Sequence, residues 1–149
     1  KYKNVRFVMA GSGDLLTRMI LRVASLRMLD KFHFTGFLKG IEVEKMYATS
    51  DVYVMPSVSE PFGISPFEAL LYDVPAIISK QSGVAEVLDN AIKVDFWDID
   101  RLAEMMLMLL EDDELAKEVA EKSKGDMEFI HWDVAGEKIK IVYKTILNN

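Results

Sequence analysis

Short apolar segments that alternate with helical ones constrain the fold of this chain more than any other feature. Each segment has four to six mostly apolar residues, and together they occupy residues 5–10, 32–35, 52–55, 75–79 and 91–94. Segments of this length that are apolar almost throughout predict strands buried on both faces, as in a parallel sheet covered by helices. The chain is therefore predicted to have a doubly wound α/β fold, in which ligands bind beyond the carboxyl ends of the strands.

The intervening and following segments carry apolar residues at helical spacing. Helices are predicted after Asp14, which would cap the first of them, and at residues 41–49, 99–110, 113–128 and 134–147, with a helical turn at 83–88. The methionines within residues 102–110 are predicted to lie in the core, because methionine fills irregular apolar space.

Composition excludes several classes of protein. Half of the 149 residues are hydrophobic, which suits a single domain spanning residues 1–149. A net charge of −6 argues against nucleic acid or an anionic membrane as the main partner. The absence of cysteine excludes disulfides and thiolate metal sites and fits a cytoplasmic location, while no segment is long enough to span a membrane. One glutamine in a chain rich in Lys and Glu hints at a thermophilic source.

Two glutamates flank the loop after the third predicted strand. Residues 54–72 read VMPSVSEPFGISPFEALLY and place Glu60 and Glu68 eight positions apart. Ser65 before Pro66 predicts a helix that begins at Pro66 with Ser65 as its cap. Such a helix start attracts anionic oxygens, because its first N–H groups are unpaired and the helix dipole is positive there. A capping box is the simpler interpretation, in which Glu68 bonds back to the Ser65 amide.

Other familiar motifs fail on inspection. Gly11-Ser12-Gly13 lacks the third small residue of a dinucleotide site, because Leu16 stands there, and no Gly-Lys-Ser/Thr phosphate loop occurs. Asp51 precedes its strand, whereas a phosphoacceptor aspartate would follow one. His33 and His131 have no partners at metal-ligand spacing, so neither a metal nor a cofactor is expected.

The segment PSVSEPFGISPFEALLYDVPAI resembles the Glu-x7-Glu region of retaining glycosyltransferases of the GT-B fold. FVMAGSG, FHFTGF, SDVYVMPS and GVAEV are similar to further segments of the C-terminal, nucleotide-sugar-binding half of these enzymes, in the same order. Glycogen and starch synthases are the members that the chain resembles most, also through KVDFWDID and the closing helix. The resemblance implies a fragment of a larger two-domain enzyme, in which the first strand–helix unit of this half is missing.

The resemblance also implies roles for individual residues. Glu60 would lie by the transferred sugar as the catalytic carboxylate, and Glu68 would bind the ribose hydroxyls. The donor-binding residues would further include Gly63, Ile64, Gly11, Gly13, Thr35, Gly36, Phe37, Ser82 and Gly83. The implied donor is ADP-glucose or UDP-glucose, and the implied acceptor is a glucan held by the missing N-terminal domain.

One departure from the family concerns the donor pyrophosphate. Relatives hold it with an Arg and a Lys from the loop after their first strand, and neither Lys1, Lys3 nor Arg6 lies in such a loop. We therefore expect the isolated 149-residue chain to bind donor weakly and to catalyse nothing, and clear turnover by the purified chain would contradict this. The alternatives are a non-catalytic nucleotide- or sugar-phosphate-binding module, or an epimerase of the same architecture.

Overall fold

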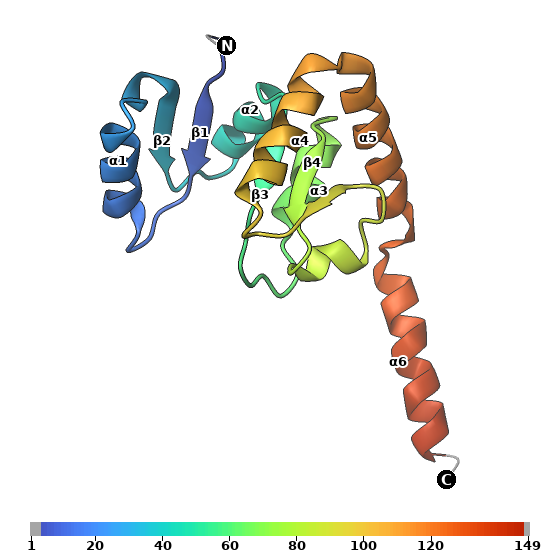
Figure 1. The fold of residues 1–149 in the computed structure, drawn as a ribbon. Helices are drawn as coiled ribbons and strands as arrows, with labels where there is room; N and C mark the ends of the chain where they lie inside the picture. The colour runs from blue at the N-terminus through green and yellow to red at the C-terminus, as the bar shows by residue number, and fades with distance from the viewer. Residues whose placement is uncertain (1–3, 148–149) are drawn as a thin grey trace. The chain divides into compact units, whose positions relative to one another are not determined.

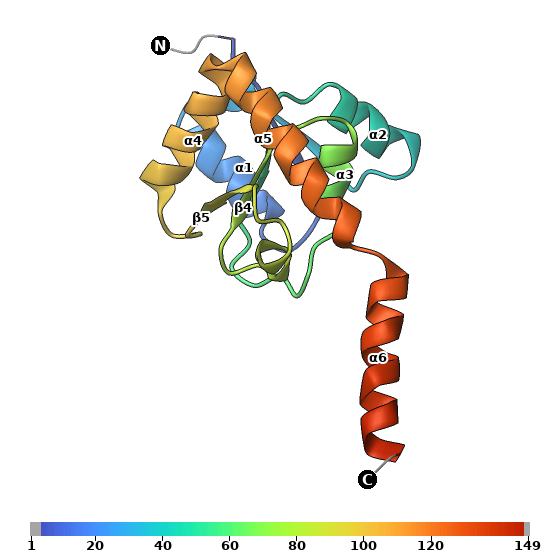
Figure 2. The ribbon, with the colours of Figure 1, turned by 90° about the vertical axis from the view of Figure 1, so that its right-hand side faces the viewer.

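A computed structural model describes residues 4–147, so Lys1 and Lys3 lie outside the described part. The chain divides into two compact units, Lys1–Met46 and Tyr47–Asn149. In chain order the elements are β1 (Phe7–Ala10), α1 (Leu16–Ser25), η1 (Leu29–Lys31), β2 (Phe32–Gly36), α2 (Ile41–Ala48), β3 (Tyr53–Met55), α3 (Ser65–Leu71), β4 (Ala76–Ser79), η2 (Gly83–Glu86), β5 (Ile92–Val94), α4 (Ile99–Glu111), α5 (Asp113–Asp126), η3 (Met127–Phe129) and α6 (Trp132–Leu147) (Figures 1 and 2).

Every strand pair is parallel, which confirms the predicted α/β class. β1 pairs with β2 in the first unit, and β4 lies between β3 and β5 in the second. The strands thus belong to two sheets.

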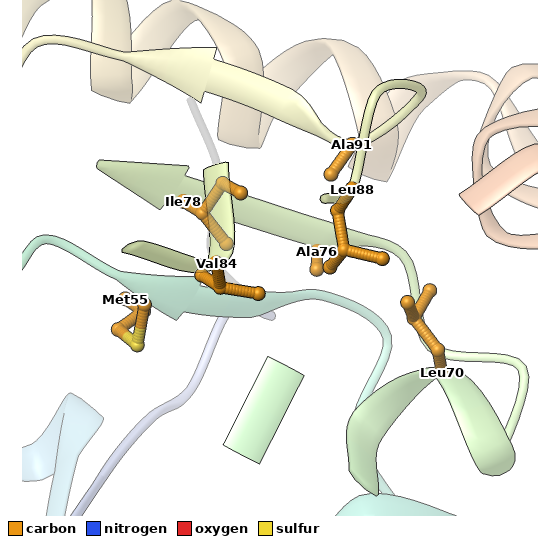
Figure 3. Close-up of a cluster of buried hydrophobic side chains, with 7 residues drawn as sticks. All are labelled: Met55, Leu70, Ala76, Ile78, Val84, Leu88 and Ala91. Carbon is orange, nitrogen blue, oxygen red and sulfur yellow. The ribbon is translucent and has the colours of Figure 1, made fainter. Parts of the chain in front are cut away.

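The main core surrounds β4, all of whose residues are buried. Ala76 and Ile78 face one side of the sheet, where they pack with Met55, Leu70, Val84, Leu88 and Ala91 (Figure 3). Ile77 faces the other side and packs with Val94, Met105 and Leu109. Side chains of α3 and η2 therefore cover one face and those of α4 and α5 cover the other, as the strand pattern predicts. The predicted core position is confirmed for Met105, and Met106 and Met108 are partly buried and pack against the same core.

The first unit has a smaller core. Among its described residues Val23 of α1 is the buried apolar side chain, and an aromatic stack of Phe7 on Phe32, with ring centroids 4.7 Å apart, joins β1 to β2. The predicted cap at Asp14 is wrong. α1 begins at Leu16 without a side-chain cap, because a backbone turn in which the Leu16 N–H donates to the Gly13 oxygen (3.0 Å) leads into the helix instead.

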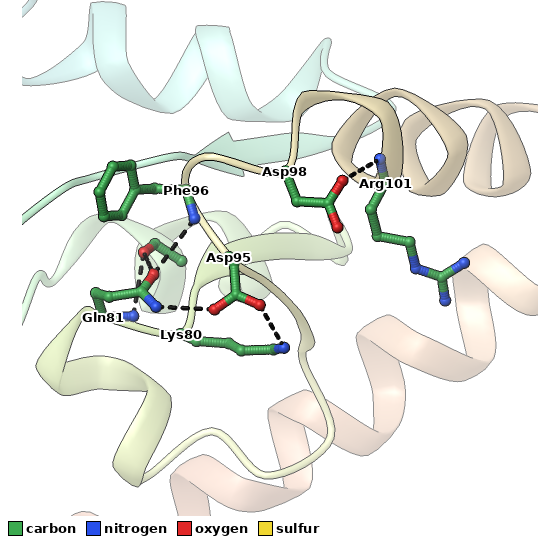
Figure 4. Close-up of polar contacts among 7 residues, drawn as sticks. Lys80, Gln81, Asp95, Phe96, Asp98 and Arg101 are labelled. Atoms are coloured by element: carbon green, nitrogen blue, oxygen red, sulfur yellow. Dashed lines mark hydrogen bonds and ion pairs between the residues drawn. The ribbon is translucent and has the colours of Figure 1, made fainter.

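The two helices over the second face of the main sheet begin at aspartates. The Asp98 carboxylate accepts from the Arg101 N–H at 3.0 Å (Figure 4), and the Asp112 carboxylate accepts from the Leu115 N–H at 2.9 Å. Both bonds satisfy N–H groups that a helix start leaves unpaired. The last helix, α6, has no buried residue, and no helix within residues 4–147 is long and apolar enough to cross a membrane.

Candidate functional site

The loop between β3 and α3 folds back on itself at Gly63. Gly63 has φ 81°, in the left-handed region that favours glycine. A Cβ at this position would lie 3.0 Å from Cγ of Glu60 and 3.2 Å from Sδ of Met55. The absence of a side chain at Gly63 therefore allows the Glu60 side chain to lie against the loop backbone, above the buried end of β3.

The backbone of Glu60 is held by the turn that follows β4. Glu60 forms a parallel bridge with Ser82, and the Gly83 N–H donates to the Glu60 oxygen at 2.8 Å. The approach is so close that a Cβ on Gly83 would lie 1.9 Å from the Pro61 oxygen. The structure thus brings three of the predicted site residues together through their main chain.

A polar network supports this turn from the side of β5 (Figure 4). The Asp95 carboxylate accepts from Lys80 Nζ at 2.8 Å and from Gln81 Nε2 at 2.9 Å, and the Ser82 hydroxyl donates to the Ser79 oxygen at 2.6 Å. The hydrogen bonds from Lys80 and Gln81 hold the pKa of Asp95 below its ordinary value. Sequence reasoning did not assign Lys80, Gln81 or Asp95 to the site, because no local motif links residues 80–81 to residue 95.

The start of α3 differs from the prediction. The helix begins at Ser65 rather than Pro66, and no side chain caps it, so the predicted Ser65 cap and the capping box with Glu68 are both wrong. The Ser65 hydroxyl instead lies 2.7 Å from the Tyr53 hydroxyl, and the Tyr47 hydroxyl donates to Oε2 of Glu68 at 3.2 Å. The side chains of Ser65 and Glu68 thus form hydrogen bonds with two partly buried tyrosines, and not with the backbone at the helix start as predicted.

The charges of Glu60 and Glu68 both affect the pKa of Tyr53. Burial raises the pKa of Tyr53, the hydrogen bond with Ser65 opposes this rise, and the negative charges of Glu68 and then Glu60 add to it. Burial also raises the pKa of Tyr47, with further contributions from Tyr53 and Glu68. Both phenols are therefore neutral around neutral pH and can donate hydrogen bonds.

Gly63 and Ile64 precede α3 directly. The Ile64 oxygen accepts from the Glu68 N–H at 3.1 Å, which is the first turn of the helix, and the Ile64 side chain is 67% exposed. A ligand at the start of α3 would therefore meet an exposed apolar side chain.

The other predicted donor-binding residues lie in the first unit, where two turns meet. The Gly11 N–H donates to the Gly36 oxygen at 2.7 Å, and both glycines have positive φ, 124° and 69°. The Thr35 hydroxyl also donates to the Gly36 oxygen, at 2.8 Å. Phe37, which follows Gly36 directly, is 68% exposed, and Lys39 Nζ lies over its ring at 5.6 Å from the centroid.

The side chains of the second unit that could bind a ligand, Glu60 and Glu68, are hydrogen-bond acceptors. Two carboxylates lie at the carboxyl end of β3 and the start of α3, where they can accept from the hydroxyl groups of a sugar. Within residues 4–147 no group of three or more His, Cys, Asp or Glu side chains is arranged to hold a metal ion. A hollow of about 410 Å³ lies at the opposite, amino-terminal edge of the sheet, and neither Glu60 nor Glu68 lines it.

Comparison with known proteins places this chain in a family. Residues 1–126 match the family described as Glycosyl transferases group 1. An uncharacterized glycosyltransferase of Methanocaldococcus jannaschii is 32% identical over 145 residues, which are 95% of this chain and 37% of that protein. A glycogen synthase of Leptospira biflexa is 31% identical over 91 residues, 61% of this chain and 19% of the enzyme. The chain thus spans well under half the length of these relatives.

The fold has counterparts among solved structures. The structure of HepE from Anabaena in complex with UDP-glucose superposes with a TM-score of 0.81 at 18% identity, over 96% of this chain and 42% of that protein. At this identity the likeness shows the fold alone. The chain accordingly belongs to the group 1 glycosyltransferases and has the fold of the C-terminal half of a GT-B enzyme.

Proposed function

We propose that this chain is the donor-binding half of a retaining glycosyltransferase that transfers glucose from ADP-glucose or UDP-glucose to a glucan. The observation that carries the proposal is the loop between β3 and α3, in which the Glu60 backbone is bonded to the Ser82–Gly83 turn and the Glu68 carboxylate accepts a hydrogen bond from Tyr47. Family membership, the similarity to a glycogen synthase and the UDP-glucose bound to HepE support it.

In this proposal Glu60 lies by the anomeric carbon of the donor. The bond between that carbon and the diphosphate oxygen breaks, and the nucleoside diphosphate leaves with the electron pair. An acceptor hydroxyl oxygen forms the new bond to the carbon, and its proton passes to the departing diphosphate oxygen. Positive charge develops on the sugar as the leaving group departs, and a fixed carboxylate stabilises it. The amides around Gly63 and Ile64 would donate to oxygens of the sugar and the phosphates.

Glu68 would accept hydrogen bonds from the two ribose hydroxyls. For the first unit, the resemblance assigns contact with the base to the turns at Gly11, Gly13, Thr35 and Gly36 and to the exposed ring of Phe37. The diphosphate would also need cationic side chains around it, such as the Arg and Lys that hold it in the family. We propose that the whole protein supplies them, as an Arg–Lys pair, together with the domain that holds the acceptor.

Replacing Glu68 with alanine tests the nucleotide site. In the protein that carries this chain, we expect Glu68→Ala to weaken binding of ADP or UDP about 10- to 150-fold, because a hydrogen bond to a charged group contributes about 1.5–3 kcal/mol. Isothermal titration calorimetry with each nucleotide measures the change. Glu121→Ala, which removes an exposed glutamate from α5, is the matched control and should bind as the wild type does.

The same titration separates the alternatives. Unchanged affinity in Glu68→Ala would contradict a ribose contact and would favour a nucleotide- or sugar-phosphate-binding module of another kind. If Glu68→Ala weakens nucleotide binding, parallel titrations with ADP-glucose and UDP-glucose then report the base and sugar preference. An epimerase would interconvert the sugar without an acceptor, which a product assay in the absence of glucan detects.

A further inference from the structure

Tyr47 makes a contact with Glu68 that the sequence pattern did not reveal. Tyr47 is the first residue of the second unit and lies near the end of α2, 21 positions before Glu68. Its hydroxyl donates to Oε2 of Glu68 at 3.2 Å in a partly buried position. Glu68, the residue proposed to bind the ribose, therefore has a hydrogen-bond partner from another element. A side chain in that position can orient the Glu68 carboxylate.

The ring of Tyr47 is itself held by two other aromatic rings. It stacks on Tyr72, with centroids 6.1 Å apart and planes 24° apart, and meets Tyr53 edge-on at 6.0 Å and 61°. Aromatic contacts of these geometries are favourable beyond the area that they bury. The Tyr47 hydroxyl therefore has a defined position relative to the start of α3.

A second phenol fixes the helix that carries Glu68. The Tyr53 hydroxyl lies 2.7 Å from the Ser65 hydroxyl, on the first residue of α3 and one turn before Glu68. β3, which carries Tyr53, is bonded to the buried strand β4. The side chain of Glu68 is thus held at its tip by Tyr47 and at its base by the helix that Tyr53 anchors to the sheet.

We propose that Tyr47 is the positioning residue for Glu68, and that it holds the carboxylate in the orientation that accepts both ribose hydroxyls of a bound nucleotide. A carboxylate has about four acceptor positions on its two oxygens. The contact from Tyr47 uses one position on Oε2, which leaves Oε1 and the remaining position on Oε2 for two adjacent hydroxyls. A glutamate held in this way before binding loses less side-chain freedom when the nucleotide arrives.

This inference rests on the proposed function. A nucleotide without ribose hydroxyls separates the positioning of Glu68 from any other effect of a Tyr47 substitution on binding. The experiment uses the protein that carries this chain and whichever of ADP and UDP binds it more tightly, together with the 2′,3′-dideoxy form of that nucleotide. We expect Tyr47→Phe to weaken binding of the ribonucleotide about tenfold, the lower end of the range for hydrogen bonds to charged groups. Binding of the dideoxynucleotide should change by less than about twofold, because Glu68 then has no hydroxyl to accept from.

Two further measurements distinguish positioning from structural support. In a Glu68→Ala background, Tyr47→Phe should have no additional effect, since residues that act through one another are not additive. In steady-state kinetics the KM for the donor should rise about tenfold while kcat stays within about twofold. Tyr47→Phe keeps the stacked ring, and Tyr143→Phe, at an exposed tyrosine of α6, serves as the matched control.

Each result decides between the two claims. If Glu68→Ala weakens ribonucleotide binding and Tyr47→Phe does not, the positioning role is wrong and the ribose contact stands. Equal losses for the ribonucleotide and its dideoxy form would also overturn the positioning role, because they would show a general structural effect. If neither ADP nor UDP binds, or if Glu68→Ala is without effect, the proposed function itself fails.

Discussion

Replacing Gly83 with alanine is expected to remove nucleotide-sugar binding and to destabilise the fold. The new Cβ would lie 1.9 Å from the carbonyl oxygen of Pro61 and 2.8 Å from its carbon, and both are backbone atoms. Neither atom can rotate away, so the two loop segments must separate, and the hydrogen bond from the Gly83 N–H to Glu60 is lost with them. Overpacking together with one lost hydrogen bond gives a destabilisation of about 2–4 kcal/mol.

Urea unfolding measures the stability of Gly83→Ala, and titration with ADP-glucose and UDP-glucose measures its binding. The matched control is Gly136→Ala, in the interior of α6, where an added Cβ meets nothing within 4 Å. That variant should be unchanged or more stable by about 0.5–1 kcal/mol, because alanine favours a helix over glycine. Wild-type stability and affinity in Gly83→Ala would show that the Glu60 segment does not depend on this close approach.

The contact at Gly83 also marks the limit of what the sequence predicts. Residues 83–88 were expected to form a helical turn, and the structure has a 3₁₀ helix at Gly83–Glu86, so the local element was found. The approach of this turn to Pro61 depends on the packing of two loops that are more than twenty residues apart in the chain. Local patterns do not contain that information.

The strands were easier to predict than the ends of the helices. Each apolar segment holds a strand, with boundaries that differ by one or two residues, because burial on both faces leaves little choice of residue type. The start of α3 was predicted from the capping preferences of Ser65 and Glu68. In the structure, contacts with distant residues replace the cap: Tyr47 and Tyr53 form hydrogen bonds with the Glu68 and Ser65 side chains, and no side chain caps the helix.

The roles of the site residues came from the resemblance and not from the strand pattern. Periodicity placed the loop of Glu60 at the carboxyl end of a strand, which is where ligands bind in such folds. It could not distinguish a sugar-binding carboxylate from a surface glutamate. The supporting network of Lys80, Gln81 and Asp95 escaped both arguments, because it forms only when the turn after β4 and the end of β5 come together.

Replacing Glu60 with glutamine is expected to lower kcat of the protein that carries this chain by about 100- to 1000-fold. Glutamine has nearly the same shape and can still accept hydrogen bonds, so the substitution removes the negative charge and little else. Loss of one group aimed at developing charge costs about 10²–10³ in kcat in well-studied enzymes. The KM for the donor should change only a few-fold, because the charge on the sugar develops mainly in the transition state.

The structure makes Glu60→Gln a cleaner test than most loop substitutions. The contacts that hold this segment, the bridge with Ser82 and the hydrogen bond from Gly83, are made by the Glu60 main chain. Unfolding by urea should therefore be unchanged, in contrast to Gly83→Ala, and Glu121→Gln on α5 should match the wild type in both stability and rate. Because stability is expected to be unchanged, a loss of kcat would be due to the missing charge and not to unfolding. A Glu60→Gln protein with wild-type kcat would exclude the carboxylate from glycosyl transfer. The site would then bind a nucleotide sugar through Glu68 while the charge that favours bond breaking came from another part of the protein.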